Sequence, residues 1–167
     1  MKLSSIECIA RALNNAEVSF LVVGGLAVVA HGYGRQTQDL DLVIRLDAPC
    51  IDAAFAALAG LGYHPRIPVT SQQMADPSQR SRWISERAMV VLPFHSELHP
   101  ETPIDIFVTE PIDFNTEYGA AMVTDVAPGV PLRIVRLETL LRMKADAGRP
   151  QDLADIAELR QIHGGMK

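Results

Sequence analysis

Residues 21–44 read LVVGGLAVVAHGYGRQTQDLDLVI, and this stretch decides the fold. It begins inside an apolar, β-branched segment at residues 18–23, whose short length and composition predict a buried strand. Gly24 and Gly25 interrupt that segment, and residues 26–30 then predict a short helix. The order of strand, glycine pair and helix places a tight backbone turn directly before the polar part of the stretch.

The polar part leads into a second predicted strand at residues 38–45. Because side chains alternate along a strand, Asp39 and Asp41 point to the same face, about 7 Å apart at the backbone. A third acid, Asp105, interrupts an apolar strand predicted at residues 104–108, where an unpaired charge is costly. If the two strands are neighbours, the three carboxylates meet, and such a cluster is suited to Mg²⁺ or Mn²⁺.

Two simpler interpretations of the acids remain open. An Asp-x-Asp pair is also typical of a solvated strand face, with Asp105 at a sheet edge. A carboxylate-dependent metal nuclease would explain the acids but not the glycine turn. The turn favours a phosphate site, because Gly24 and Gly25 leave backbone N–H groups accessible to an anion. His31, which lies between the two motifs, is expected to cap or line the same pocket.

Residues 21–44 resemble the signature of the DNA polymerase β-like nucleotidyltransferase superfamily. The resemblance is closest to its toxin-related bacterial branches, including the AbiEii-type abortive-infection proteins. Those proteins carry a Gly-Gly or Gly-Ser turn, a short helix, an R-x-[ST]-x-D-x-D stretch and a later lone Asp. The matching residues here are Gly24, Gly25, Arg35, Thr37, Asp39, Asp41 and Asp105. The later segment KADAGRPQDLADIAEL resembles their K-x(4)-R-x-x-D motif, and residues 62–102 show no likeness.

The resemblance implies a metal-dependent nucleotidyltransferase that moves a nucleoside monophosphate from an NTP to a hydroxyl acceptor. RNA, protein and small molecules are all open as that acceptor, and an antitoxin is a candidate partner. The residues implied in nucleotide binding are Gly24, Gly25, His31, Arg35, Thr37, Lys144 and Asp152. Many active relatives carry Ser at the position of Gly25, so the alternative is a catalytically inactive nucleotide- or partner-binding domain.

The chain is expected to end in a helical hairpin made of residues 136–147 and 150–163, with Gly164 and Gly165 closing the second helix. Helical spacing places Lys144 on the apolar face of the first helix and Asp152 on the buried face of the second. These two residues either form a structural salt bridge or serve the nucleotide, with Asp152 orienting Lys144. Arg149 and Asp155 are expected in solvent.

The whole pattern predicts an α/β (α+β) fold: a mixed β-sheet with flanking helices and a C-terminal helical hairpin. One domain is expected over residues 1–167, with the sheet-containing core over 1–135 and the hairpin over 136–167. Outside the deciding stretch, we expect a helix capped by Ser4 or Ser5 that runs to Asn15, a helix at 51–61, a long loop at 64–82 with at most a short helix, a turn at 95–103, and strands at 88–94, 121–126 and 131–135.

Composition narrows the function classes. The formal net charge of -5 argues against an extended basic surface for nucleic acid, although it leaves room for a local basic patch. Cys8 and Cys50 are the only cysteines and are expected to be reduced thiols. The N-terminus shows no secretion signal, and no apolar run approaches the ~20 residues that span a bilayer. These features predict a soluble cytoplasmic protein without membrane partners.

Overall fold

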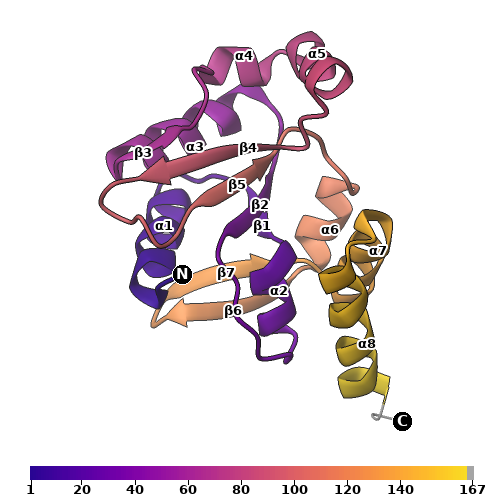
Figure 1. Cartoon of the computed structure of the whole chain (residues 1–167). Helices are drawn as coiled ribbons and strands as arrows, with labels where there is room; N and C mark the ends of the chain where they lie inside the picture. The colour runs from indigo at the N-terminus through magenta and orange to yellow at the C-terminus, as the bar shows by residue number, and fades with distance from the viewer. Residues whose placement is uncertain (165–167) are drawn as a thin grey trace.

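The computed structural model describes residues 1–164, which build a mixed sheet with helices packed on both of its faces (Figure 1). Within these residues the sheet has seven strands in the order β3-β4-β5-β2-β1-β7-β6. The elements in chain order are α1 (Leu3–Asn15), β1 (Phe20–Val22), α2 (Gly24–Ala30), β2 (Leu40–Ile44), α3 (Ala48–Gly60), β3 (Tyr63–Pro65), α4 (Ser71–Ala75), α5 (Pro77–Arg87), β4 (Val91–Ser96), β5 (Ile104–Phe107), α6 (Phe114–Ala120), β6 (Met122–Ala127), β7 (Val130–Ile134), α7 (Leu137–Ala147) and α8 (Pro150–Gly164).

Strand β2 lies in the middle of the sheet and is paired on both sides. It runs antiparallel to β1 and parallel to β5, and Asp41 is directly opposite Asp105 in the register. Beyond β1, strand β7 is parallel to it and β6 is antiparallel to β7. The predicted fold class, an α/β (α+β) fold with a mixed sheet and C-terminal helices, is confirmed.

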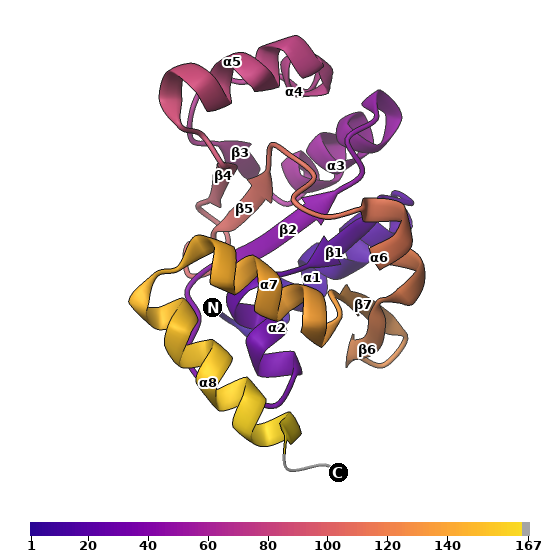
Figure 2. The ribbon, with the colours of Figure 1, turned by 90° about the vertical axis from the view of Figure 1, so that its right-hand side faces the viewer.

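The apolar core lies between the sheet and helices α1 and α3. Leu40, Leu42 and Ile44 of β2 are fully buried, and Phe55 of α3 packs edge-on against Phe94 of β4 with ring centroids 5.1 Å apart. On the other face, α2 and the α7–α8 hairpin lie over β1 and β2 (Figure 2). Asp41 alternates with the core-facing leucines, so it points to this second face.

The predicted loop at residues 64–82 is wrong, because these residues form most of β3, α4 and α5. Thr70 begins α4 with a reciprocal capping box to Gln73. Asp76 caps α5, which has Pro77 at its first position. Each helix buries only one large side chain, Met74 in α4 and Trp83 in α5, so the segment shows no apolar period despite its clear start signals.

Several predicted boundaries also need correction. The opening helix begins at Leu3, and neither Ser4 nor Ser5 caps it. The strand predicted at 88–94 begins only at Val91, because Ala88 adopts a left-handed conformation (φ 50°) that ends α5. That strand then continues to Ser96, inside the predicted turn.

Two further segments differ from the expectations. The short helix before the second strand begins at Gly24 rather than at residue 26. Helix α6, capped by Asp113, was not predicted. The predicted helix end at Gly165 lies outside the described residues. Within residues 1–164, no helix combines the length and apolar character needed to cross a membrane.

Candidate functional site

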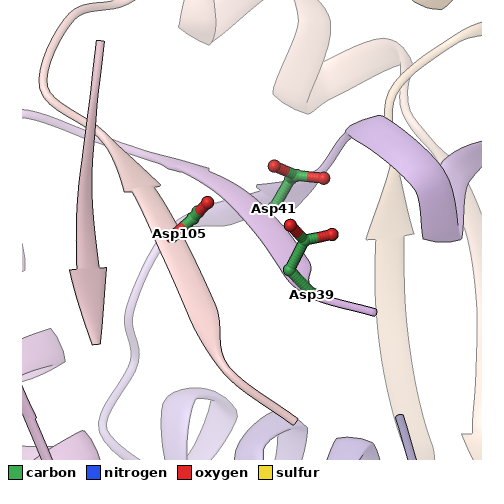
Figure 3. Close-up of side chains that lie close together, drawn as sticks. All are labelled: Asp39, Asp41 and Asp105. Carbon is green, nitrogen blue, oxygen red and sulfur yellow. The ribbon is translucent and has the colours of Figure 1, made fainter. Parts of the chain in front are cut away.

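Three carboxylates meet at the start of strands β2 and β5. Asp39 directly precedes β2, Asp41 lies on it, and Asp105 lies opposite Asp41 on β5. One carboxylate oxygen of each residue lies within 4.8 Å of the corresponding oxygens of the other two. Figure 3 shows the side chains on neighbouring strands, with the carboxyl group of Asp105 directed toward β2. The parallel pairing therefore assembles the cluster from residues that are far apart in the sequence.

Burial and mutual repulsion both act on the acids of the cluster. Burial, followed by the charges of Asp39 and Asp105, raises the pKa of Asp41 to about 6. Burial, followed by the charge of Asp39, also raises the pKa of Asp105, while Arg66 acts in the opposite direction. Like charges held this close disfavour ionisation unless a cation lies between them.

The donor set fits a hard divalent cation. All three ligands are carboxylate oxygens, which Mg²⁺ and Mn²⁺ prefer over nitrogen or sulfur donors. Among residues 1–164, no other three His, Cys, Asp or Glu side chains converge in this way. Asp39, Asp41 and Asp105 are therefore the residues that could hold a metal in this part of the chain.

The glycine turn is built around Asp41. The Val23 N–H donates to the main-chain oxygen of Asp41 at 3.0 Å, and the Gly25 N–H lies 3.4 Å from Asp41 Oδ2. Gly24 has a φ of 60°, and a Cβ atom on it would lie 1.9 Å from Asp41 Oδ2. Only glycine fits there, because any side chain would occupy the place of the carboxylate.

Gly25 is required for a different reason. A Cβ atom at this position would lie 2.2 Å from Thr37 Oγ1 and 3.2 Å from a guanidinium nitrogen of Arg35. Thr37 and Arg35 thus fill the space that a side chain at position 25 would use. Both residues were expected near the nucleotide from the resemblance, and in the structure both lie against the glycine turn.

A chain of ion pairs links the glycine turn to the C-terminal hairpin. The guanidinium of Arg35 donates two hydrogen bonds to the carboxylate of Asp155, from Nε to Oδ1 at 2.7 Å and from Nη2 to Oδ2 at 2.9 Å. Lys144 then bridges two acids, with Nζ 2.6 Å from Asp155 and 2.9 Å from Asp152. Arg149 closes the chain, with Nε 2.7 Å from Asp152 Oδ2. The hairpin is therefore held on the turn by alternating charges.

One expectation for this hairpin is wrong and one is confirmed with an addition. Asp155 was predicted to lie in solvent, but its side chain is 0% exposed. Helix α8 buries Asp152, Asp155, Ile156 and Leu159 on one face, so a second acid joins the predicted pair. The Arg149 side chain is 75% exposed as predicted, yet it is not isolated, because Asp152 binds it.

Lys144 and Arg149 differ in exposure, and this difference separates their roles. The side chain of Lys144 is only 5% exposed and both of its carboxylate partners are buried. Burial alone would raise the pKa of Asp152, but hydrogen bonds from Arg149 and Lys144 outweigh it and lower that pKa. Lys144 thus has the predicted salt bridge to Asp152. Arg149 is an accessible cation near the acids, and its charge acts on Asp41.

His31 lies at the other end of α2 from the glycine turn, roughly 10 Å along a helix of seven residues. Its Nε2 is 2.8 Å from the main-chain oxygen of Val135, and His163 Nε2 is 2.8 Å from the main-chain oxygen of His31. The ring fastens the end of α2 to neighbouring segments. The structure therefore places His31 at the far end of α2 and does not bring it to the pocket that it was expected to cap or line.

Sequence reasoning did not select Arg149, although it lies inside the late motif. Its position just before Pro150, at the first turn of a helix that begins with buried acids, is the signal that points to it. Compared with known proteins, the chain matches no family model and no curated protein sequence. The function is therefore argued from the geometry of the site.

Proposed function

We propose that this protein is a metal-dependent nucleotidyltransferase, which moves a nucleoside monophosphate from an NTP to a hydroxyl acceptor. The observation that carries the proposal is the convergence of Asp39, Asp41 and Asp105 against the glycine turn, with oxygens within 4.8 Å of one another. Phosphoryl-group transfer depends mainly on positioning and on neutralising phosphate charge. A cluster of acids beside accessible backbone N–H groups suits both tasks.

In the proposed reaction, the acceptor oxygen forms a bond to the α-phosphorus of the NTP. The bond between that phosphorus and its bridging oxygen to the β-phosphate breaks, and pyrophosphate leaves. Asp105 is placed to take the proton of the acceptor hydroxyl, because it lies on the side of the cluster away from the glycine turn. Mg²⁺ or Mn²⁺ held by the three acids would supply the neutralisation of phosphate charge.

The nucleotide side of the site is assigned to the turn and to Arg149. Arg35 and Lys144 are both neutralised by Asp155, so they hold the hairpin in place. Arg149 remains exposed and acts electrostatically on Asp41, which suits it to bind a phosphate. The hydroxyl of Thr37 occupies the space that a side chain at Gly25 would use, and many active members of the superfamily that the sequence resembles carry a serine at that position. Thr37 is thus the proposed source of the hydroxyl contact to phosphate.

The biological setting is also part of the proposal. A cytoplasmic location supplies both NTP and Mg²⁺. The resemblance of the sequence to toxin-related proteins suggests that an antitoxin restrains the activity. The formal net charge of -5 argues against an extended basic surface around the site.

Label transfer from α-³²P-labelled NTP tests the proposal. The protein is incubated with Mn²⁺ and with separate fractions of total RNA, total protein and small metabolites, and labelled products and pyrophosphate are both measured. We expect metal-dependent labelling that Asp41→Asn abolishes. Asp52→Asn is the matched control, because Asp52 is an exposed acid on α3, the helix that covers the opposite face.

Two results would change the assignment. Metal-dependent NTP binding without turnover on any fraction would favour the catalytically inactive, nucleotide- or partner-binding alternative. Absence of metal-dependent NTP binding in the folded wild-type protein would overturn both versions.

A further inference from the structure

The acid cluster continues into a row of side chains that crosses the sheet. Asp41 is opposite Asp105, and Asp105 is opposite Pro93 of β4. The next position belongs to Arg66, just after β3, whose N–H donates to the main-chain oxygen of Pro93 at 2.8 Å. Laterally paired residues point to the same face of a sheet. Arg66 therefore follows the acids on the same face, about 10 Å from Asp105 at the backbone.

A second row lies beside the first. The N–H of Leu40 donates to the main-chain oxygen of Pro103, which aligns Pro103 with Asp39. His95 of β4 is opposite His64 of β3, and both side chains are exposed. His95 Nδ1 lies 3.1 Å from the main-chain oxygen of His64, so the other ring nitrogen is free to face a ligand. The two rows form one polar strip from the acids to β3.

The strip ends in a pocket of about 210 Å³ whose lining includes Arg66, His95, His99, Glu97 and Pro103. Figure 1 looks onto this face of the sheet, with β4 and β5 in front of α1 and α3. No helix covers β4 in this view, so a ligand that reaches the acids from this side meets the strip first.

The end of the strip away from the acids carries the positive charge of Arg66. Within residues 1–164, the guanidinium of Arg66 makes no hydrogen bond or salt bridge, although the chain as a whole carries a net charge of -5. Three of the five histidines, His64, His95 and His99, lie on or beside the strip.

The two exposed cations flank the acids from opposite sides. Arg149 approaches from the α7–α8 hairpin and Arg66 from β3, with the cluster between them. A single NTP would occupy only one of these two sides of the acid cluster. The other side is then available for a second anionic group.

We propose that Arg66, His64 and His95 form the acceptor site, and that the acceptor carries a phosphate close to its nucleophilic hydroxyl. This inference rests on the proposed nucleotidyltransferase function. The guanidinium pairs with the phosphate, and the histidine rings offer flat surfaces for the rest of the acceptor. A nucleoside monophosphate and the 3′ end of an RNA share this chemistry. An unphosphorylated protein hydroxyl would leave Arg66 without a partner.

Binding of a 5′-fluorescein-labelled oligouridylate of ten nucleotides, followed by anisotropy, tests the inference without requiring turnover. The nucleotide side is first saturated with Mg²⁺ and a non-hydrolysable NTP analogue. We expect Arg66→Ala to weaken oligonucleotide binding about tenfold, which corresponds to about 1.4 kcal/mol. His95→Ala should also weaken it. Arg11→Ala is the control, because it removes the same charge from exposed α1, on the opposite side of the sheet.

Competition distinguishes the two sources of the phosphate. Displacement of the probe by unlabelled AMP, but not by adenosine, indicates a mononucleotide acceptor. Displacement only by unlabelled oligonucleotide indicates an RNA end. Either result supports the phosphate-bearing class.

The inference is overturned if Arg66→Ala and Arg11→Ala bind the probe alike, or if neither the oligonucleotide nor AMP binds the wild-type protein. Transfer of label to unphosphorylated protein at an unchanged rate in Arg66→Ala would also overturn it. These failures leave NTP-dependent stabilisation intact. Conversely, Arg66-dependent probe binding without any NTP binding would overturn the proposed function but would still support the strip as an anion-binding site.

Discussion

Gly24 and Asp41 share one small volume, and this contact makes the glycine part of the acid cluster. A methyl group on Gly24 would lie 1.9 Å from Asp41 Oδ2 and 2.5 Å from its carboxyl carbon. The φ of 60° at Gly24 adds a backbone preference for glycine. The carboxylate therefore keeps its position only while residue 24 has no side chain.

Gly24→Ala should consequently lower metal affinity while the protein stays folded. The new methyl group displaces the Asp41 carboxylate, and we expect the Mn²⁺ dissociation constant to rise about 10–100-fold, as for other changes that misplace a ligand. Isothermal titration with Mn²⁺ measures it. Gly34→Ala is the control, since a Cβ there meets nothing within 4 Å. Equal affinity in the two variants would contradict the crowding argument.

Asp41 also predicts a pH dependence of stability. Its pKa in the folded protein is raised from 3.8 to about 6, first by burial and then by Asp39 and Asp105. The folded state thus holds this proton more tightly than the unfolded chain. The metal-free protein should lose stability as pH rises from about 4 through about 6.

Urea unfolding between pH 4 and pH 7, in the presence of EDTA, measures this dependence. Asp41→Asn should flatten the profile and raise stability above pH 6, because it removes one of three repelling charges. Saturating Mg²⁺ should reverse the slope for the wild-type protein. A variant that unfolds instead would show that Asp41 has a structural role.

At the scale of elements, the ion chain from Arg35 to Arg149 determines where the hairpin lies. Arg35 and Asp155 are 120 residues apart in sequence, and Lys144 joins Asp155 to Asp152 across the two helices. Lys144, Asp152 and Asp155 lie at the centre of this ion chain and are buried, so each charge depends on its neighbours for compensation. Loss of one member leaves an unpaired charge in a low-dielectric place.

Lys144→Met is therefore expected to lower the free energy of unfolding by about 3–5 kcal/mol. The reason is that Asp152 and Asp155 lose the cation between them. Chemical denaturation measures the change. The double variant Lys144→Met/Asp155→Asn removes one charge of each sign and should recover part of the loss. A single variant of normal stability with lost NTP affinity would instead make Lys144 a nucleotide ligand.

The sequence predicted elements well where they have an apolar period and poorly where they do not. The strands on both sides of the glycine turn are strongly apolar or alternate, and their ends were placed within two residues. Helices α4 and α5 bury one large residue each, so their capping signals at Thr70 and Asp76 were the only clues. A weak amphipathic pattern surrounded by prolines is easily taken for a loop.

The site is assembled from four separate segments: the glycine turn, β2, β5 and the α7–α8 hairpin. Ligand binding should therefore stabilise the whole fold. We expect Mg²⁺ or Mn²⁺ to raise the melting temperature, and an NTP to raise it further. At 100 times the dissociation constant, binding contributes about 2.7 kcal/mol. For a chain of this size each kcal/mol corresponds to about 2–4 °C.

Differential scanning calorimetry with metal, with NTP, and with both measures this stabilisation. Asp41→Asn is the control, because it should lose the metal-dependent part. No shift at millimolar metal and NTP would count against a working site.

The candidate site divides into parts that sequence reasoning reached and parts that depend on tertiary contacts. Asp39 and Asp41 followed from strand alternation, and Asp105 from the cost of a charge in an apolar strand. The interpretation of Asp155 was wrong because its burial depends on how α8 docks against Arg35. Arg66 was not selected because its place beside the acids depends on the register of β3, β4 and β5, which a single sequence does not reveal.

The parallel pairing of β2 with β5 has a consequence for synthesis on the ribosome. The glycine turn and the first two acids emerge early, but Asp105 must emerge before the cluster is complete, and α8 must follow before Arg35 finds Asp155. A growing chain therefore carries no complete site until α8 is made. A premature stop codon anywhere before α8 would release an inert fragment, so the proposed activity depends on synthesis past this helix.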